Sequence, residues 1–124
     1  MSHDVIADGL NNIMNAKRSR KDSLVLTRYS KLFIGILEIA KNLGYIENYN
    51  LHEKKLIIKF GKFMKCGAIK PRFNVSVNNI EKYMKRYLPG RGIGVIIIST
   101  NKGLVTHIEA IEKNFGGALI AYFY

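Results

Sequence analysis

The chain combines two hydrophobic periodicities, one of about 3.6 residues and one of about two. Residues 4–16 carry apolar side chains at i, i+4, i+7 and i+8, which predicts an amphipathic helix. A second helix is predicted after Ser30, a residue suited to cap it, and Gly44 follows its last apolar position. Between the helices, residues 17–22 predict a charged connection, and residues 24–26 are an apolar run that predicts a short strand.

The middle of the chain predicts a hairpin followed by a linker. Residues 45–49 and 55–60 predict two strands, which a polar turn over residues 50–54 would join. Residues 61–71 then hold two glycines and a proline among lysines, a composition typical of a connecting segment. We therefore place a boundary between two lobes inside this linker.

The segment after the linker predicts shorter elements. Residues 73–77 alternate apolar and polar side chains, which indicates a half-buried strand. Asn78 or Asn79 is suited to cap a short helix, which residues 88–90 would end. Residues 95–98 are a continuous β-branched run, typical of a strand that is buried on both faces.

The end of the chain predicts one more helix and one more strand. The spacing of Thr106 and Glu109 fits a capping box and predicts a helix that ends near Asn114. A pair of glycines then turns the chain into a terminal apolar strand, residues 118–124.

Together these elements predict an α+β fold made of two small lobes. Residues 1–65 would form an N-terminal lobe in the order helix, strand, helix and hairpin. Residues 66–124 would form a C-terminal, β-rich lobe with a mixed sheet and short helices. With 124 residues, 48% of them hydrophobic, the chain is long enough to fold without disulfides or metal.

The charge of the chain points to a polyanionic partner. The formal net charge is +11, and residues 54–91 alone hold eleven lysines and arginines with one acid, Glu81. A smaller basic cluster lies at residues 17–21. Like charges confined to one region repel one another, so the asymmetry favours nucleic acid first and an anionic membrane surface second.

Several other classes of protein are disfavoured. No apolar run of about 18 residues predicts a membrane span, and the first residues do not resemble a signal peptide. A single cysteine, Cys66, excludes an internal disulfide and fits a reducing compartment. The three histidines and Cys66 lack metal-ligand spacing, and His107 is expected to be a surface or capping residue. We expect no catalytic residues, no metal and no cofactor.

The segment Ser99, Thr100, Asn101, Lys102 and Gly103 is the candidate binding loop. Its hydroxyl and amide groups both donate and accept hydrogen bonds, which suits base edges and the ribose 2′-OH, and its lysine suits a phosphate. Taken by themselves, the same residues also fit an ordinary polar hairpin turn.

An ordered set of segments along the whole chain carries a resemblance to a known family. These segments are residues 4–10 with 13 and 15–16, 30–32, 44–46, 65–73, 86–89, 98–103 and 116–117. With them the chain resembles, from end to end, the protein eight family of the small ribosomal subunit (the S-eight family), and its archaeal branch more closely. Residues 98–103, Ile-Ser-Thr-Asn-Lys-Gly, resemble the family's S-T-S-K-G signature, with Asn101 in place of its third residue.

The resemblance implies a two-lobed α+β fold and a structural role as a primary binder of small-subunit ribosomal RNA. It implies that the signature loop reads the distorted core of an irregular RNA helix in the central domain. Additional RNA-binding residues are expected among the cations and at the paired glycines: Lys17, Arg18, Lys31, Lys70, Arg72, Arg86, Arg91 and Gly117.

Other classes of function stay open at this point. An RNA-binding regulator or an RNA-processing factor outside the ribosome is the alternative, although no clustered acid or base favours processing chemistry. A membrane-surface protein would need exposed apolar residues on a basic helix. Our preferred hypothesis is a cytoplasmic ribosomal protein, not an enzyme, that is monomeric when free and contacts ribosomal RNA and neighbouring small-subunit proteins.

Overall fold

The computed structural model describes residues 4–70, 72, 74–90 and 92–124. The chain divides into two compact units, Met1–Gly67 and Ala68–Tyr124. Each unit contains two α-helices and an antiparallel sheet among its described residues. The predicted α+β class is confirmed.

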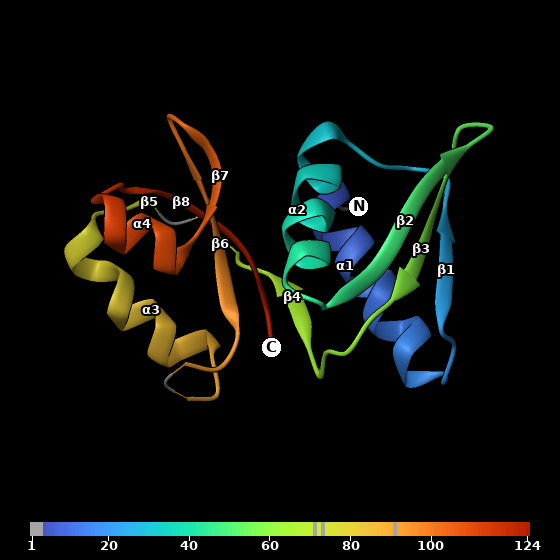
Figure 1. Cartoon of the computed structure of the whole chain (residues 1–124), viewed down its shortest axis with the longest axis horizontal. Helices are drawn as coiled ribbons and strands as arrows, with labels where there is room; N and C mark the ends of the chain where they lie inside the picture. Colours follow the sequence, from blue (N-terminus) through green and yellow to red (C-terminus); the bar gives the residue numbers. More distant parts are fainter. Residues whose placement is uncertain (1–3, 71, 73, 91) are drawn as a thin grey trace. The chain divides into compact units, whose positions relative to one another are not determined.

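The first unit places two helices on one face of a three-stranded sheet (Figure 1). The helices are α1 (Val5–Arg18) and α2 (Lys31–Asn42), and the strands are β1 (Ser23–Leu26), β2 (Ile46–His52) and β3 (Lys55–Phe60) in the spatial order β1-β3-β2. Asp4 caps α1 through bonds from the Ile6 and Ala7 N–H groups, and Ser30 caps α2 as predicted.

The core of the first unit follows from the predicted periodicities. Leu10 and Ile13 of α1 are fully buried, as is the apolar stripe of α2, and β3 alternates buried Leu56 and Ile58 with exposed neighbours. The helices approach closely at Gly9, because a Cβ there would lie 2.6 Å from the Phe33 ring.

The boundaries of two segments differ from the prediction in this unit. The hairpin turn is only Glu53–Lys54, both at positive φ (51° and 64°), so the predicted turn over residues 50–54 was too long. A turn of this kind lets β2 continue to pair as far as His52. Lys17 and Arg18 belong to the last turn of α1 rather than to a connection, where cations favour the helix dipole.

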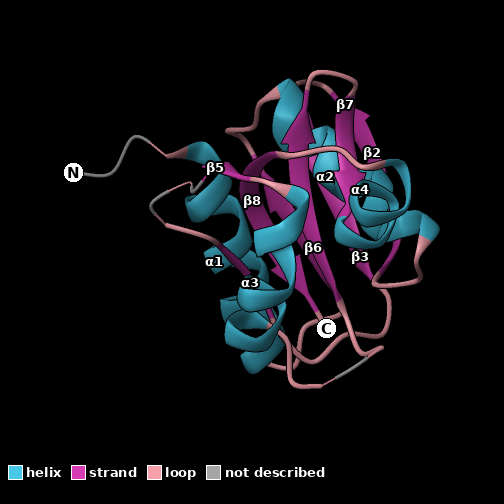
Figure 2. Ribbon diagram, turned by 90° about the vertical axis from the view of Figure 1, so that its left-hand side faces the viewer, coloured by secondary structure: helices cyan, strands magenta, loops and turns pink. Residues whose placement is uncertain are grey.

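The second unit is a five-stranded sheet with α3 and α4 on the same face (Figures 1 and 2). Four strands follow the order β4-β8-β6-β7, and β5 pairs with β8. The elements are β4 (Cys66–Ala68), of which only Ala68 belongs to this unit, β5 (Asn74–Val75), the 3-10 helix η1 (Val77–Asn79), α3 (Ile80–Tyr87), β6 (Val95–Thr100), β7 (Gly103–Thr106), α4 (His107–Lys113) and β8 (Gly117–Phe123). Ile96 and Ile98 of β6 pack with Ile80 of α3 and Ala110 of α4 in one hydrophobic cluster.

The predicted strand at residues 73–77 is mostly wrong. Only Asn74 and Val75 of the described residues pair, with β8, and Phe73 lies outside the described residues, as does Pro71 of the predicted linker. The strand pairing ends at Val75, and Val77 begins η1. Asn79 precedes α3, but its side chain does not cap the helix; its amide instead donates to the Ser76 hydroxyl at 3.3 Å.

His107 was predicted at the surface or in a cap, and the structure buries it. His107 is only 3% exposed, and its Nδ1 accepts a hydrogen bond from the Ile96 N–H at 3.0 Å. Burial lowers the pKa of the imidazole, which keeps Nδ1 available as an acceptor. Thr106, one residue earlier, caps α4 as predicted, by accepting from the Glu109 N–H at 3.2 Å.

Candidate nucleic-acid interface

The candidate loop is a tight hairpin tip. Ser99 and Thr100 are the last residues of β6, Gly103 begins β7, and only Asn101 and Lys102 form the turn. The prediction of a five-residue loop was therefore wrong, because both strands continue to pair until Thr100 meets Gly103.

The Thr100 hydroxyl holds this turn in shape. It donates to the Gly103 carbonyl oxygen at 2.9 Å and accepts from the Lys102 N–H at 3.1 Å. Gly103 has a φ of 105°, a conformation that a residue with a side chain rarely adopts. Asn101 and Lys102 are exposed, so an amide and an ammonium project from a turn whose backbone is already fixed.

A stiff strand anchors the hairpin tip. Four consecutive residues of β6, Val95 to Ile98, are at most 4% exposed, and β6 pairs on one side with β7 and on the other with β8. The prediction of a fully buried strand at residues 95–98 is confirmed. The polar tip therefore extends from a fully packed strand.

The start of β8 and the turn before it lie beside the hairpin. A Cβ on Gly117 would collide with the Ser99 carbonyl oxygen, which explains why glycine stands there. A hollow of about 250 Å³ lies between the two turns, with Asn101 and Lys102 on one side and Asn114 and Phe115 on the other. The structure thus brings Gly117, a predicted site residue, to the hairpin.

Sequence reasoning missed Asn114, Phe115 and Gly116 as neighbours of the hairpin. One signal was present: an asparagine after a helix is suited to the left-handed conformation, and Asn114 adopts it with a φ of 60°. That conformation ends α4 and directs the chain toward the hollow. The pairing of β6 with β8, which closes the arrangement, is a tertiary feature that local patterns do not contain.

The predicted cations are distributed over both units. Lys17, Arg18 and Lys31 belong to the first unit, where the Lys17 ammonium lies 5.1 Å from the centre of the Phe63 ring. Lys70, Arg72 and Arg86 are exposed residues of the second unit. Arg91 lies outside the described residues.

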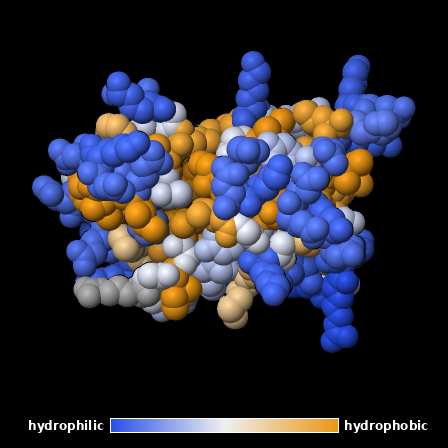
Figure 3. Space-filling model, viewed as in Figure 1, coloured by the Kyte–Doolittle hydropathy of each residue, from blue (hydrophilic) through white to orange (hydrophobic). Residues whose placement is uncertain are grey.

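Aromatic rings accompany some of these cations. On α3, the Arg86 guanidinium and the Lys82 ammonium lie 5.5 Å and 5.9 Å from the Tyr83 ring centre. Figure 3 shows long hydrophilic side chains that project between hydrophobic areas of the surface.

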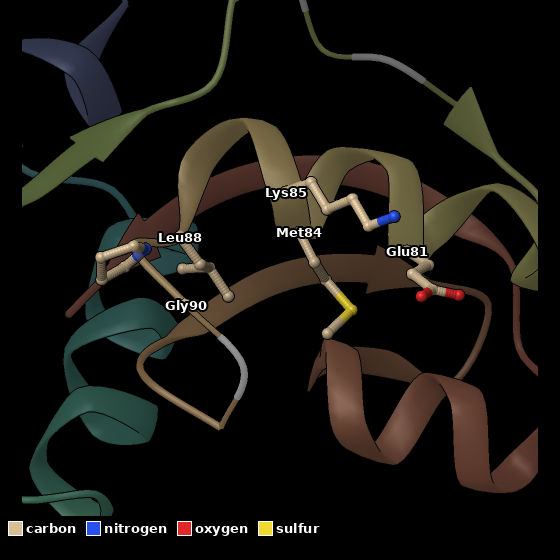
Figure 4. Close-up of a pocket in the computed structure, with 6 residues that line it drawn as sticks. Glu81, Met84, Lys85, Leu88 and Gly90 are labelled. Carbon is tan, nitrogen blue, oxygen red and sulfur yellow. The ribbon is translucent and has the colours of Figure 1, made fainter.

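A second hollow of the same unit has a different character. It measures about 360 Å³ and is lined by α3 and the turn that follows it. Met84 and Leu88 extend to the same side of α3, and Glu81 and Lys85 also line it (Figure 4). It shares no lining residue with the hollow at the hairpin and presents no comparable set of hydrogen-bonding groups.

Metal and thiol chemistry find no support in the part of the chain that the structure describes. No group of three or more potential His, Cys, Asp or Glu ligands occurs among those residues. Burial raises the pKa of the Cys66 thiol to about 12, so it stays protonated and is a poor ligand and nucleophile. Over the same residues, no helix has both the length and the hydropathy required to cross a bilayer.

Comparison with known proteins matches the sequence of the chain to one family. The model of the family described as Ribosomal protein S8 matches residues 4–124. The small ribosomal subunit protein uS8 of Nanoarchaeum equitans is 43% identical to this chain over 129 aligned residues, which cover 100% of both proteins. The uS8 protein of Picrophilus torridus is 38% identical over 100% of both chains, and uS8A of Schizosaccharomyces pombe is 38% identical over 97% of this chain and 96% of its own. The chain therefore belongs to the ribosomal protein S8 family.

Proposed function

We propose that this protein is a structural constituent of the small ribosomal subunit that binds ribosomal RNA directly and supports assembly of the subunit. Membership of the family and the names of the relatives support the ribosomal role. The observation that carries the RNA-binding site is the β6–β7 hairpin, whose fixed polar tip extends from a buried strand.

The hairpin suits recognition of an irregular RNA helix. Regular A-form RNA offers proteins shape, phosphates and 2′-OH groups, whereas distorted segments also expose base edges. The Ser99 hydroxyl and the Asn101 amide both donate and accept, and the Lys102 ammonium donates to phosphate. Because Thr100 uses its hydroxyl to fix the turn, its role in binding is to position its neighbours.

The cations supply affinity that depends on salt. The cations that would contact phosphates are Lys17, Arg18, Lys31, Lys70, Arg72, Arg86 and Arg91. If about six cations engage, affinity should fall on the order of a thousandfold between about 50 and 200 mM salt. Specificity then rests on the hairpin and on Gly117 at the start of β8. The hairpin includes Asn101, which stands where the family signature has serine.

The same chemistry defines the proposed partners. The protein acts without catalysis and resides on cytoplasmic ribosomes, where it contacts small-subunit RNA and neighbouring ribosomal proteins. A net charge of +11 opposes self-association, so the free protein is a monomer.

Chemical footprinting of small-subunit ribosomal RNA, with and without the protein, tests this function. We expect protection concentrated in one irregular helix of the central domain, and we expect this protection to be weakened in Ser99→Ala and Lys102→Ala. Lys82→Ala, on the exposed side of α3, should act mildly and mainly through salt dependence. Protection spread evenly over the RNA, or equal losses from all three variants, would contradict specific recognition by the hairpin.

A further inference from the structure

Helix α4 exposes two isoleucines that lie one turn apart. Ile108 is 57% exposed and Ile111 is 43% exposed, whereas His107 and Ala110 of the same helix are buried. β-Branched residues are weaker helix formers than the alanine, glutamate or lysine that usually occupy exposed helix positions. Helix propensity therefore does not account for this apolar pair, and burial in the core does not either. Single exposed apolar residues are common, but neighbouring ones form a patch of the kind that marks an interaction site.

The exposed pair lies on the flank of α4 that faces α3. α4 runs along β6 in the direction of that strand, because it begins beside Ile96 and ends beside the hairpin tip. α3 lies over β8, and Figure 2 shows the two helices side by side across the sheet with β6 between them. A right-handed helix advances by about 100° per residue. Counted from the buried face of α4, this rotation brings Ile108 and Ile111 to the side of α3.

The facing flank of α3 is hollowed and largely apolar. The hollow of about 360 Å³ is lined by Glu81, Met84 and Leu88, which are spaced at i, i+3 and i+7 and therefore share one flank. Met84 extends from this flank toward α4 (Figure 4). The residues of the two flanks together form the α3–α4 groove, which consists of Glu81, Met84, Leu88, Ile108, Ile111 and Glu112.

The α3–α4 groove is acidic although the unit around it is basic. Residues 68–124 contain eight lysines and arginines but only three acids, and all three acids belong to α3 or α4. Glu109 is paired within its own helix. Glu81 and Glu112 form no ion pair with the residues that the structure describes. Lys85 also lines the hollow, so the groove and its rim carry one net negative charge.

We infer that the α3–α4 groove docks a basic amphipathic helix of another protein of the small subunit. The inference rests on the proposed function and names the surface that meets one of its protein partners. An amphipathic helix places apolar side chains into a groove at i, i+3, i+4 and i+7, which suits the two isoleucines and the hollow at Met84. The cations beside that stripe would pair with Glu81 and Glu112. RNA fits poorly because the carboxylates repel phosphates, and a second copy of the same face would bring the same acids.

The double variant Ile108→Gln/Ile111→Gln tests the inference without a change of charge. A synthetic helical peptide of leucine and lysine is the probe, because the net charge of +11 repels it from other surfaces of the protein. In isothermal titration calorimetry we expect the double variant to bind this probe about tenfold more weakly than the original protein. The matched control is Leu51→Gln, which replaces a residue 53% exposed in the other unit and should leave the affinity within about twofold. No binding by the original protein, or equal binding by both variants, would overturn the inference.

The charge of the occupant has its own test. Glu112→Gln removes one carboxylate of the groove and should weaken binding of the leucine–lysine probe about threefold. Glu53→Gln removes an exposed acid of the other unit and should leave this binding unchanged. Equal binding by these two variants would overturn the basic character of the occupant.

A cross-link in the assembled subunit identifies what occupies the groove. The protein, with a benzophenone side chain in place of Ile108, is reconstituted with small-subunit RNA and the other small-subunit proteins. Illumination should join it to a second protein, at a helix that carries lysine or arginine beside apolar residues. An adduct with RNA, an adduct with a second copy of this chain, or no adduct would overturn the inference.

RNA binding separates this inference from the proposed function. Ile108→Gln/Ile111→Gln should bind the central-domain RNA fragment as the original protein does, whereas Lys102→Ala should bind it more weakly. If Lys102→Ala has this effect and the double variant keeps its full affinity for the probe, the hairpin function stands and the groove assignment fails. A loss of RNA affinity in the double variant as large as that in Lys102→Ala would assign this flank of α4 to RNA and would also overturn the inference.

Discussion

Two hairpins of the protein, β2–β3 and β6–β7, have similar tips but differ in how deeply their strands are buried. Both β2–β3 and β6–β7 turn through two residues, and both tips carry a lysine, Lys54 in one and Lys102 in the other. β3 alternates buried and exposed residues, whereas β6 is buried at four consecutive positions. The second tip also has a hydroxyl that fixes its turn and a second turn beside it. A charged tip alone is therefore a weak indicator of a site, and the packing beneath it is the better one.

The largest effect expected on the β6–β7 hairpin comes from Gly117→Ala. A Cβ at this position collides with the Ser99 carbonyl oxygen, so β8 must move away from β6. We expect a loss of about 3 kcal/mol in the free energy of unfolding, measured by urea denaturation. Gly90→Ala is the control, because a Cβ there meets only the Ile93 side chain at 3.5 Å. Equal stabilities of the two variants would contradict the described contact.

A smaller loss of stability is expected when His107, the buried hydrogen-bond acceptor beside β6, is replaced. His107→Leu leaves the Ile96 N–H without its partner, which should destabilise the protein by about 2 kcal/mol. His107→Asn is the control, because its amide oxygen takes a place close to that of Nδ1 and should restore part of the loss. If both variants lose the same stability, the hydrogen bond contributes little.

The same histidine predicts how stability depends on pH. Burial lowers the pKa of His107 in the folded protein, so below the ordinary value of about 6.5 the unfolded chain binds a proton that the folded one resists. Stability should be constant above that pH and should fall as the pH drops below it. The decline between pH 7.5 and 5.5 should be shallower in His107→Leu. An identical decline in both proteins would assign the pH dependence to other groups.

The two lysines provide the most direct comparison of the hairpins. Lys102→Ala should weaken binding to the cognate RNA helix about tenfold, the equivalent of about 1.4 kcal/mol. Lys54→Ala removes the same charge from the tip of the other hairpin and should change affinity about twofold at most. Filter binding at one fixed salt concentration measures both. Similar losses of RNA affinity in the two variants would mean that a lysine at the tip of a buried strand contributes no more to binding than a lysine at the other tip.

The smallest effect concerns the shape of the turn itself. Thr100→Val keeps the β-branched form but removes both hydrogen bonds of the hydroxyl, which should cost about 1 kcal/mol of stability. RNA affinity should fall about threefold because the tip becomes less ordered. Thr100→Ser retains the hydroxyl and should bind nearly as the original protein does. A Thr100→Val variant with unchanged affinity would show that the turn is ordered without these bonds.

Much of the fold was predictable because burial and periodicity coincide. The apolar stripe of α1, the capping residue Ser30 and the apolar run of β6 are each visible in a short stretch of sequence. The turns were less predictable, because their length depends on backbone conformation. Glu53 and Lys54 adopt positive φ without the glycine or asparagine that usually indicates it.

The candidate site was predictable only in part. Polarity predicted an exposed tip at Asn101 and Lys102, but Ser99, Thr100 and Gly103, which lie in strands, were predicted to be loop residues. Phe115 was missed because its place beside the hairpin depends on the pairing of β6 with β8, which no local pattern encodes.

The hydrogen bonds of Thr100 also bear on the kinetics of assembly. Because the turn is already closed in the protein alone, little protein ordering remains for the moment of encounter. Any slow rearrangement on binding would then belong to the RNA, which must bring its distorted segment to a fixed template. The association rate should accordingly respond to changes in RNA stability more than to changes that loosen the protein.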